Sequence, residues 1–210
     1  ADVYASHIHK EGTGIAFHLR TLRYERDILL GMPGLFNVEN ALAAAAVAEV
    51  YGIPGEIVAQ CLAKAAVPGR MEHYSSEDGQ VSVIVDYAHN GMSLEALLRS
   101  ARAEYPGREL TVLFGCTGGK GLDRREGMGT AAGRWAGRIL LTEDDPGPEG
   151  VADICADIQG YLNPFHKVGD VIPDRPEAVF RAVLECHAPA VVVLAGKGCE
   201  MEQKRKHGPE

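Results

Sequence analysis

Residues 110–121 read Leu-Thr-Val-Leu-Phe-Gly-Cys-Thr-Gly-Gly-Lys-Gly. The nearly continuous apolar run at 110–114 predicts a strand, and the glycines after it predict a turn. A helix is expected from about Arg125 to Ala136. Unbroken apolar runs are typical of strands buried on both faces of a parallel sheet. This stretch therefore predicts a strand, a turn and a helix of an α/β fold.

The same alternation continues on both sides of this stretch. We expect further strands at residues 81–85, 139–142 and 190–194, and further helices at 93–104, 151–160 and 175–186. Strands that alternate with helices imply right-handed crossovers and a doubly wound, mostly parallel sheet. Ligands of such sheets bind at the carboxyl ends of the strands.

The first third of the chain has another pattern. Strands are expected at residues 3–9 and 15–20, and helices at 38–51 and 57–66. Two strands at the very start suggest that the chain joins a domain already in progress.

A domain boundary is expected where Val67-Pro68-Gly69-Arg70 breaks the second helix. Residues 1–69 would then form one domain and residues 70–210 another, with the parallel sheet in the second.

The composition excludes several classes of protein. The 210 residues carry a formal net charge of −8, which argues against nucleic-acid binding. No apolar run is long enough for a membrane span, and no signal peptide is visible. The cysteines are scattered and odd in number, which favours reduced thiols in a cytoplasm over disulfides or a zinc site. We expect the basic run Lys204-Arg205-Lys206 to be a solvated tail.

Polar residues follow the expected strand at 81–85. Asp86 can accept hydrogen bonds from ribose hydroxyls, and His89 can reach a phosphate. An equal alternative is that Asp86 caps the next helix.

The glycines after the strand at 110–114 form a second candidate site. Backbone N–H groups in such a turn can bind an anion, and Lys120, Arg124 and Arg125 add positive charge. The segment fits neither standard phosphate-loop pattern. We favour anion binding over a flexible turn with solvated charges.

Two further strand ends carry carboxylates. Glu143, Asp144 and Asp145 are adjacent and repel one another unless a cation or ammonium group compensates them; the alternative is an acidic surface turn. Glu200 follows a Gly-Lys-Gly turn and can pair with an amino group.

Two asparagines stand at the start of the Ala-rich helix. Asn37 and Asn40 are three residues apart, so both amides share one helix face and can read a purine edge. Asn37 can also be the N-cap of this helix.

Four segments together resemble motifs of the Mur ligase family, and the long Gly/Arg loop and the D-[DN]-P motif point within it to the tripeptide synthetases. Residues 34–45 (GLFNVENALAAA) resemble the family's G-x-F/H-N-x-x-N-A-L-A-A segment, and residues 68–72 (PGRME) resemble P-G-R-x-E. Residues 85–89 (VDYAH) match V-D-Y-A-H, and residues 194–200 (LAGKGCE) resemble A-G-K-G-H-E. The segments occur in the family order across essentially the whole chain, and jointly they are highly specific.

The resemblance implies a fold and a reaction. Residues 1–69 would be the last part of a central ATPase domain, and 70–210 a Rossmann-like, amino-acid-binding C-terminal domain. The full enzyme would use ATP to add the third residue of the peptidoglycan stem peptide to UDP-N-acetylmuramoyl-L-Ala-D-Glu, releasing ADP. Its partners would be these small molecules, with neither nucleic acid nor membrane. We expect a monomer in the cytoplasm.

The resemblance also implies site residues. Asn37, Asn40, Arg70, Asp86 and His89 would contact ATP. The residues that would hold the incoming amino acid are Lys120, Asp145 and Glu200. The phosphate-binding lysine loop and the Mg²⁺ ligands lie upstream in the family, so this stretch would hold no catalytic residue, bind no metal and be inactive alone.

Departures from the family pattern indicate the substrate. Cys199 stands where the family usually has His, and Asn90-Gly91 where it has Thr/Ser-Pro. Diaminopimelate-adding members carry D-N-P-R, but here Gly147 replaces the Arg that pairs with the distal carboxylate. We therefore expect lysine, with ornithine and diaminopimelate as the other possibilities. The alternatives are a folylpolyglutamate- or cyanophycin-synthetase-like ligase, a divergent paralogue, and a non-catalytic nucleotide- or amino-acid-binding module.

Overall fold

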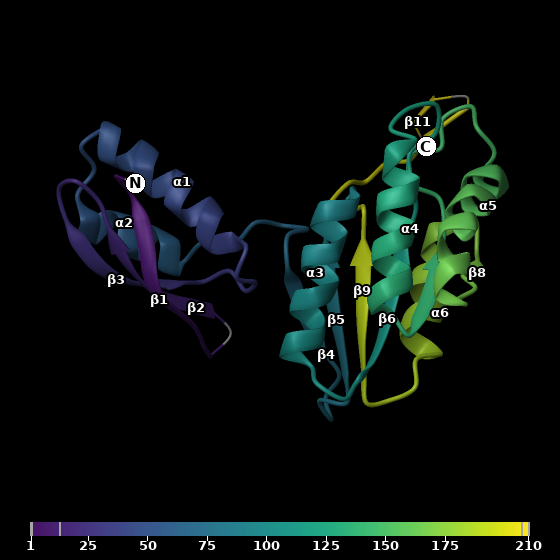
Figure 1. Cartoon of the computed structure of the whole chain (residues 1–210), viewed down its shortest axis with the longest axis horizontal. Helices are drawn as coiled ribbons and strands as arrows, with labels where there is room; N and C mark the ends of the chain where they lie inside the picture. The colour runs from purple at the N-terminus through teal and green to yellow at the C-terminus, as the bar shows by residue number, and fades with distance from the viewer. Residues whose placement is uncertain (1, 13, 207, 210) are drawn as a thin grey trace. The chain divides into compact units, whose positions relative to one another are not determined.

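The computed structural model of the chain describes residues 2–12, 14–206 and 208–209 (Figure 1). It contains two compact units, Ala1–Val67 and Pro68–Glu210. The helices in the described part of the chain are all too short or too polar to span a bilayer.

The first unit is a three-stranded antiparallel sheet with two helices. Its elements are β1 (Tyr4–Glu11), β2 (Gly14–Arg20), β3 (Glu25–Leu30), α1 (Asn37–Val50) and α2 (Gly55–Ala63). Phe17, Leu19, Ile28 and Leu30 of the sheet pack with apolar residues of both helices to form its core. The two expected strands and both helices are confirmed. Strand β3 was missed because its first half is charged and exposed.

The second unit is built around a six-stranded sheet in the order β4-β5-β9-β6-β7-β8. Its elements are β4 (Glu72–Ser75), β5 (Val81–Asp86), α3 (Gly91–Glu104), β6 (Glu109–Phe114), α4 (Asp123–Trp135), β7 (Arg138–Leu141), α5 (Val151–Leu162), the 3₁₀ turn η1 (Asn163–Phe165), β8 (Asp170–Val171), α6 (Arg175–Leu184), β9 (Ala190–Ala195), β10 (Lys204–Arg205) and β11 (Gly208–Pro209). Only β4 pairs antiparallel in this sheet. The expected doubly wound, mostly parallel α/β sheet is therefore confirmed.

The strand order places helices on both faces of the sheet. The crossovers through α3, α4 and α5 all advance in one direction, whereas α6 returns the chain to β9 between β5 and β6. With right-handed crossovers, α6 must cover the opposite face. Helix α6 accordingly packs on Leu113, Leu140 and Val192, while α3, α4 and α5 pack side by side.

Burial differs between the centre and the edge of this sheet. Every residue of β9 is buried, as expected for a strand covered on both faces. Strand β5 instead alternates, with Val81, Val83 and Val85 only partly buried. It lies beside the edge strand β4, which the sequence analysis missed because its Glu-His-Tyr-Ser sequence has no apolar run.

Four polar segments meet at one edge of the sheet. Asp86 at the end of β5 is paired with Ala195 of β9, and Leu194 with Leu113 of β6. Phe114 is paired in turn with Leu141 of β7. The segments that begin after these strands are therefore neighbours in space, as the parallel arrangement requires.

Candidate functional site

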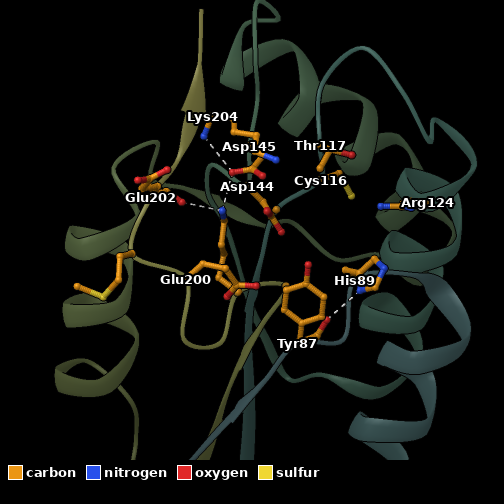
Figure 2. Close-up of a pocket in the computed structure, with 14 residues that line it drawn as sticks. Tyr87, His89, Cys116, Thr117, Arg124, Asp144, Asp145, Glu200, Glu202 and Lys204 are labelled. Atoms are coloured by element: carbon orange, nitrogen blue, oxygen red, sulfur yellow. Dashed lines mark hydrogen bonds and ion pairs between the residues drawn. The ribbon is translucent and has the colours of Figure 1, made fainter. Parts of the chain in front are cut away.

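An open cleft of about 360 Å³ lies at this edge of the sheet (Figure 2). It is lined by Tyr87, His89, Gly115, Cys116, Thr117, Arg124, Asp144, Asp145, Gly196, Lys197, Glu200, Met201, Glu202 and Lys204. Figure 2 shows Arg124 and His89 on one side, and Asp145, Glu200 and Glu202 on the other. The carboxylate side also carries cations, because Lys197 pairs with Asp145 and Lys204 lies beside it.

Two glycine contacts shape the floor of the cleft. Gly196 has φ +93°, and a Cβ there would lie 2.4 Å from a carboxylate oxygen of Asp144. A Cβ on Gly69 would lie 2.5 Å from Cα of Gly198. The Pro-Gly-Arg and Gly-Lys-Gly segments therefore approach backbone to backbone, which only glycine permits.

Asp86 connects the end of β5 to the segment that precedes β4. Its buried carboxylate accepts hydrogen bonds from the N–H of Met71 at 3.0 Å and of Ala88 at 2.8 Å. Burial raises the pKa of Asp86, and these bonds with the charge of Arg70 oppose the rise. Asp86 does not cap α3, because Asn90 does so in a capping box with Ser93. The helix-cap alternative for Asp86 is wrong.

Arg70 and His89 both lie against the Tyr87 ring at the cleft. The guanidinium carbon of Arg70 lies 4.5 Å from the centre of the Tyr87 ring, a cation–π geometry. The Tyr87 and His89 rings are 5.0 Å apart. His89 Nδ1 lies 3.0 Å from the Tyr87 carbonyl oxygen, so in a neutral ring Nε2 is the acceptor nitrogen.

The acidic turn after β7 is compensated by cations of the same chain. Arg205 pairs with the buried Glu143 through Nε at 3.0 Å and a terminal nitrogen at 2.7 Å. The N–H of Gly147 donates to the carbonyl of Lys204 at 2.8 Å. The expectation that Lys204-Arg205-Lys206 is a solvated tail is therefore wrong for Lys204 and Arg205. Their partners lie about sixty positions earlier, so no local pattern could reveal them.

Asp145 is hydrogen-bonded through both its side chain and its backbone. Its Oδ1 accepts from Lys197 Nζ at 2.5 Å and from the N–H of Lys204 at 3.0 Å, and its own N–H donates to Gln203 Oε1 at 2.9 Å. Burial would raise the pKa of Asp145, but the bonds to Lys197 and Lys204 outweigh it and lower the pKa. Asp145 is therefore ionised and already paired.

Asp144 has a different environment from Asp145. Burial raises its pKa to about 6, although the charges of Arg175 and Lys197 oppose the rise. Arg175 is itself buried, and donates to the carbonyls of Glu143 at 3.3 Å and Ala195 at 2.7 Å. Arg175 thus ties together the ends of β7 and β9. The signal for Arg175 in the sequence is its place at the start of a helix, where a cation is unfavourable.

The Gly-rich turn is held by protein acceptors. The N–H of Gly118 donates to the Asp145 carbonyl at 3.2 Å, and that of Gly119 to Glu149 Oε2 at 2.8 Å. These amides do not form the expected anion-binding nest. Arg125 is buried and pairs with Glu149 and Asp157, so it is not a ligand either. Arg124 lines the cleft, whereas Lys120 is exposed and is not among the cleft residues.

Asn37 and Asn40 belong to the first unit. The Asn40 amide donates to the Asn37 carbonyl oxygen at 2.9 Å, which confirms that they share one helix face. Asn37 is the first residue of α1 and donates to the Pro33 carbonyl at 2.7 Å; Phe36 is the N-cap. The N-cap alternative for Asn37 is therefore wrong.

The expected site residues are thus brought together only in part. His89, Asp145 and Glu200 line one cleft, and Arg70 and Asp86 adjoin it through Tyr87 and Met71. Lys197, Glu202 and Lys204 also line the cleft and were missed as site residues, although Lys197 belongs to a segment that carried the resemblance. Among the described residues, no group of three or more His, Cys, Asp or Glu side chains is placed to hold a metal ion.

The doubly wound sheet and the polar cleft at its strand ends define an α/β protein of the class in which ligands bind at that edge. Residues 69–198 match the family model described as "Mur ligase, glutamate ligase domain". The chain therefore belongs to the Mur ligase family.

Two curated relatives illustrate the similarity. The UDP-N-acetylmuramoyl-L-alanyl-D-glutamate–L-lysine ligase of Enterococcus faecalis is 42% identical over 176 residues, covering 83% of this chain and 34% of the relative. The corresponding 2,6-diaminopimelate ligase of Clostridioides difficile is 34% identical over 211 residues, covering 99% and 43%. The chain thus spans well under half the length of these relatives.

A solved structure agrees with this assignment. A UDP-N-acetylmuramoyl-L-alanyl-D-glutamate–2,6-diaminopimelate ligase superposes with a TM-score of 0.63 at 30% identity. The match covers 100% of this chain and 43% of that structure.

Proposed function

We propose that the protein carrying this chain is an ADP-forming ligase that adds lysine to UDP-N-acetylmuramoyl-L-Ala-D-Glu. In this reaction ATP phosphorylates the substrate carboxylate, and the amino group of the incoming residue attacks the acyl phosphate to give an amide, ADP and phosphate. Such catalysis depends mainly on positioning and charge neutralisation. Family membership and the ligase relatives support the reaction class.

In this proposal residues 70–210 form the domain that binds the incoming amino acid. Asp145 and Glu200 line the acidic side of the cleft and would orient ammonium groups. Lys120, on the Gly-rich turn, would reach the substrate from the edge of the cleft. Because Lys197 already neutralises Asp145, Glu200 and Glu202 would supply most of the unbalanced negative charge.

Each unit carries residues that we propose to contact ATP. Arg70, which precedes β4, and His89, which follows β5, both lie against the Tyr87 ring, and Asp86 ends β5. An aromatic ring with a guanidinium beside it suits a nucleotide. Asn37 and Asn40 of the first unit would read the purine edge, and residues 1–69 would belong to the ATPase domain. Mg²⁺ ligands would come from other parts of the protein.

The choice of lysine rests on one observation, the absence of a side chain at Gly147. Diaminopimelate carries a distal carboxylate that needs a cation, and glycine offers none. The identity of 42% to a lysine ligase is consistent with this choice.

The experiment compares kcat/KM of the protein that carries this chain for lysine, ornithine and meso-diaminopimelate. We expect lysine to be preferred over meso-diaminopimelate by about tenfold or more. A preference for diaminopimelate would refute the substrate assignment, and ligation of none of the three would refute the function. The 210-residue chain alone is expected to show neither ATP hydrolysis nor ligation. Turnover by this chain would contradict the proposal that the catalytic groups lie in other parts of the protein.

A further inference from the structure

Glu149 occupies an unusual position beside the cleft. It follows the acidic turn and lies outside the set of residues that line the cleft. Its Oε2 accepts two hydrogen bonds, from the N–H of Gly119 at 2.8 Å and from a terminal nitrogen of Arg125 at 2.7 Å. One carboxylate oxygen thus joins the Gly-rich turn to the buried cation at the start of α4.

We propose that Glu149 is a positioning residue that fixes the Gly-rich turn, with Lys120 and Arg124, against the acidic turn. This role rests on the proposed function, because it concerns how the incoming amino acid is held. The printed hydrogen bonds of the Glu149 side chain go to Gly119 and Arg125, neither of which lines the cleft, so Glu149 would act through the turn.

The packing around the Gly-rich turn supports this role. A Cβ on Gly118 would lie 1.9 Å from the Pro146 carbonyl oxygen and 2.9 Å from Cβ of Glu149. The two turns are therefore in direct backbone contact. The N–H of Gly118 also donates to the Asp145 carbonyl, so neighbouring amides of the turn are anchored on residues 145–149.

The charges make the Gly119–Glu149 bond a strong one. Arg125 is 3% exposed in its side chain and holds Glu149 ionised, and its hydrogen bond is the main cause that lowers the pKa of Glu149. Hydrogen bonds to an ionised carboxylate are roughly twice as strong as neutral ones. Without this bond, Gly119, whose φ of +70° gives it wide conformational freedom, would have no such restraint.

Asp157 provides a matched control. It also pairs with Arg125, at 2.5 Å through the other terminal nitrogen, but no bond joins it to the Gly-rich turn among the described residues. Glu149→Ala and Asp157→Ala each remove one carboxylate partner of Arg125, and only Glu149→Ala removes the acceptor of Gly119. Glu149→Gln keeps a neutral acceptor at the same place and should restore part of the effect.

The first measurement does not depend on enzyme activity. Amide hydrogen exchange at Gly119, followed by NMR on the 210-residue chain, should become about tenfold faster in Glu149→Ala. Exchange should stay near the wild-type rate in Asp157→Ala and be intermediate in Glu149→Gln. Equal acceleration in both alanine variants, or none in either, would overturn the proposal.

The second measurement uses the protein that carries this chain. Glu149→Ala should raise KM for the amino acid about tenfold and change kcat and KM for ATP less than about threefold, with Asp157→Ala near wild type. Faster exchange at Gly119 without a change in this KM would show that the bond does not position the substrate, and would overturn the role. If the wild-type protein ligates no amino acid, the proposed function fails, while the exchange measurement still decides whether Glu149 holds the turn.

Discussion

The ammonium of Lys197 lies 2.5 Å from Oδ1 of Asp145, across the cleft floor from one strand end to another. The same ammonium donates to the Glu202 carbonyl at 2.9 Å. The adjacent carboxylates after β7 are already compensated by cations of the same chain, namely Lys197, Arg175 and Arg205. The site is therefore preorganised by the protein's own cations, which lowers the reorganisation needed on binding.

The Gly69–Gly198 contact predicts a selective effect of adding one methyl group. Gly69→Ala should destabilise the second unit by about 3 kcal/mol, because left-handed strain adds to a clash with backbone that cannot move aside. Gly79→Ala is the control: Gly79 has φ +68° against +71° for Gly69, but its Cβ would meet nothing within 4 Å. This control should lose only about 1 kcal/mol. Urea unfolding measures both values, and equal losses would mean that the close approach has no energetic weight.

Asp144 predicts a pH dependence of stability. Its folded pKa of about 6 lies above its ordinary value of 3.8, so the folded state holds the proton more tightly than the unfolded state. The stability due to protonated Asp144 is fully present below about pH 4, and is lost as the pH rises through about 6. The loss is of the order of 3 kcal/mol.

Asp144→Asn isolates this contribution. The free energy of unfolding of the variant, minus that of the wild type, should rise by about that amount between pH 4 and pH 7. Subtraction removes the other titrating groups, such as Asp145, whose lowered pKa acts in the opposite direction. Denaturant unfolding at several pH values gives the difference, and a constant value across this range would contradict the burial of an ionisable Asp144.

The pair of Arg205 and Glu143 predicts that the C-terminal segment stabilises the fold. Arg205→Gln leaves the carboxylate of Glu143, which is 5% exposed, without its bidentate partner. We expect a loss of about 2 kcal/mol, below the value for a fully buried pair because Arg205 is itself partly exposed. The exposed neighbour Lys206 is the control, and Lys206→Gln should change stability by less than about 0.5 kcal/mol. Equal effects of the two substitutions would mean that the Arg205–Glu143 pair does not stabilise the fold and that the segment behaves as a solvated tail.

The framework of the fold could be predicted because its signals are local. Apolar runs such as those of β6 and β9 and the Ala-rich pattern of α1 each lie within a few residues. The meeting of the strand-end segments then follows from parallel topology alone. The polar edge strand β4 and the half-charged β3 have weak local patterns, and only pairing with their neighbours makes them strands.

The electrostatics of the site could not be predicted in the same way. The partners of Asp145 and Glu143 are 52 and 62 positions away, and those of Gly119 and Arg125 are 30 and 24 positions away. A sequence pattern takes each charged run in isolation, which favours solvent for the basic residues 204–206 and an anion for the glycine amides. Their actual partners depend on which strand ends are adjacent.

Gly147 gives the sharpest test of substrate choice. It has φ +59° and a Cβ there would meet nothing within 4 Å, so Gly147→Arg costs about 1 kcal/mol of backbone strain without a clash. The new guanidinium would stand where diaminopimelate-adding relatives have Arg, and can form a bidentate pair with a distal carboxylate. We expect the ratio of kcat/KM for meso-diaminopimelate to that for lysine to rise about ten- to a hundredfold. Gly147→Gln, with similar strain and no charge, controls for bulk and should leave the ratio within about threefold of wild type.

Lys204 is another cation that could bind a distal carboxylate. It lies beside Gly147, whose N–H donates to the Lys204 carbonyl at 2.8 Å, and it lines the cleft. If Lys204 already serves a distal carboxylate, Gly147→Arg will change the ratio little, Lys204→Gln will lower the use of diaminopimelate, and the assignment of lysine will be wrong.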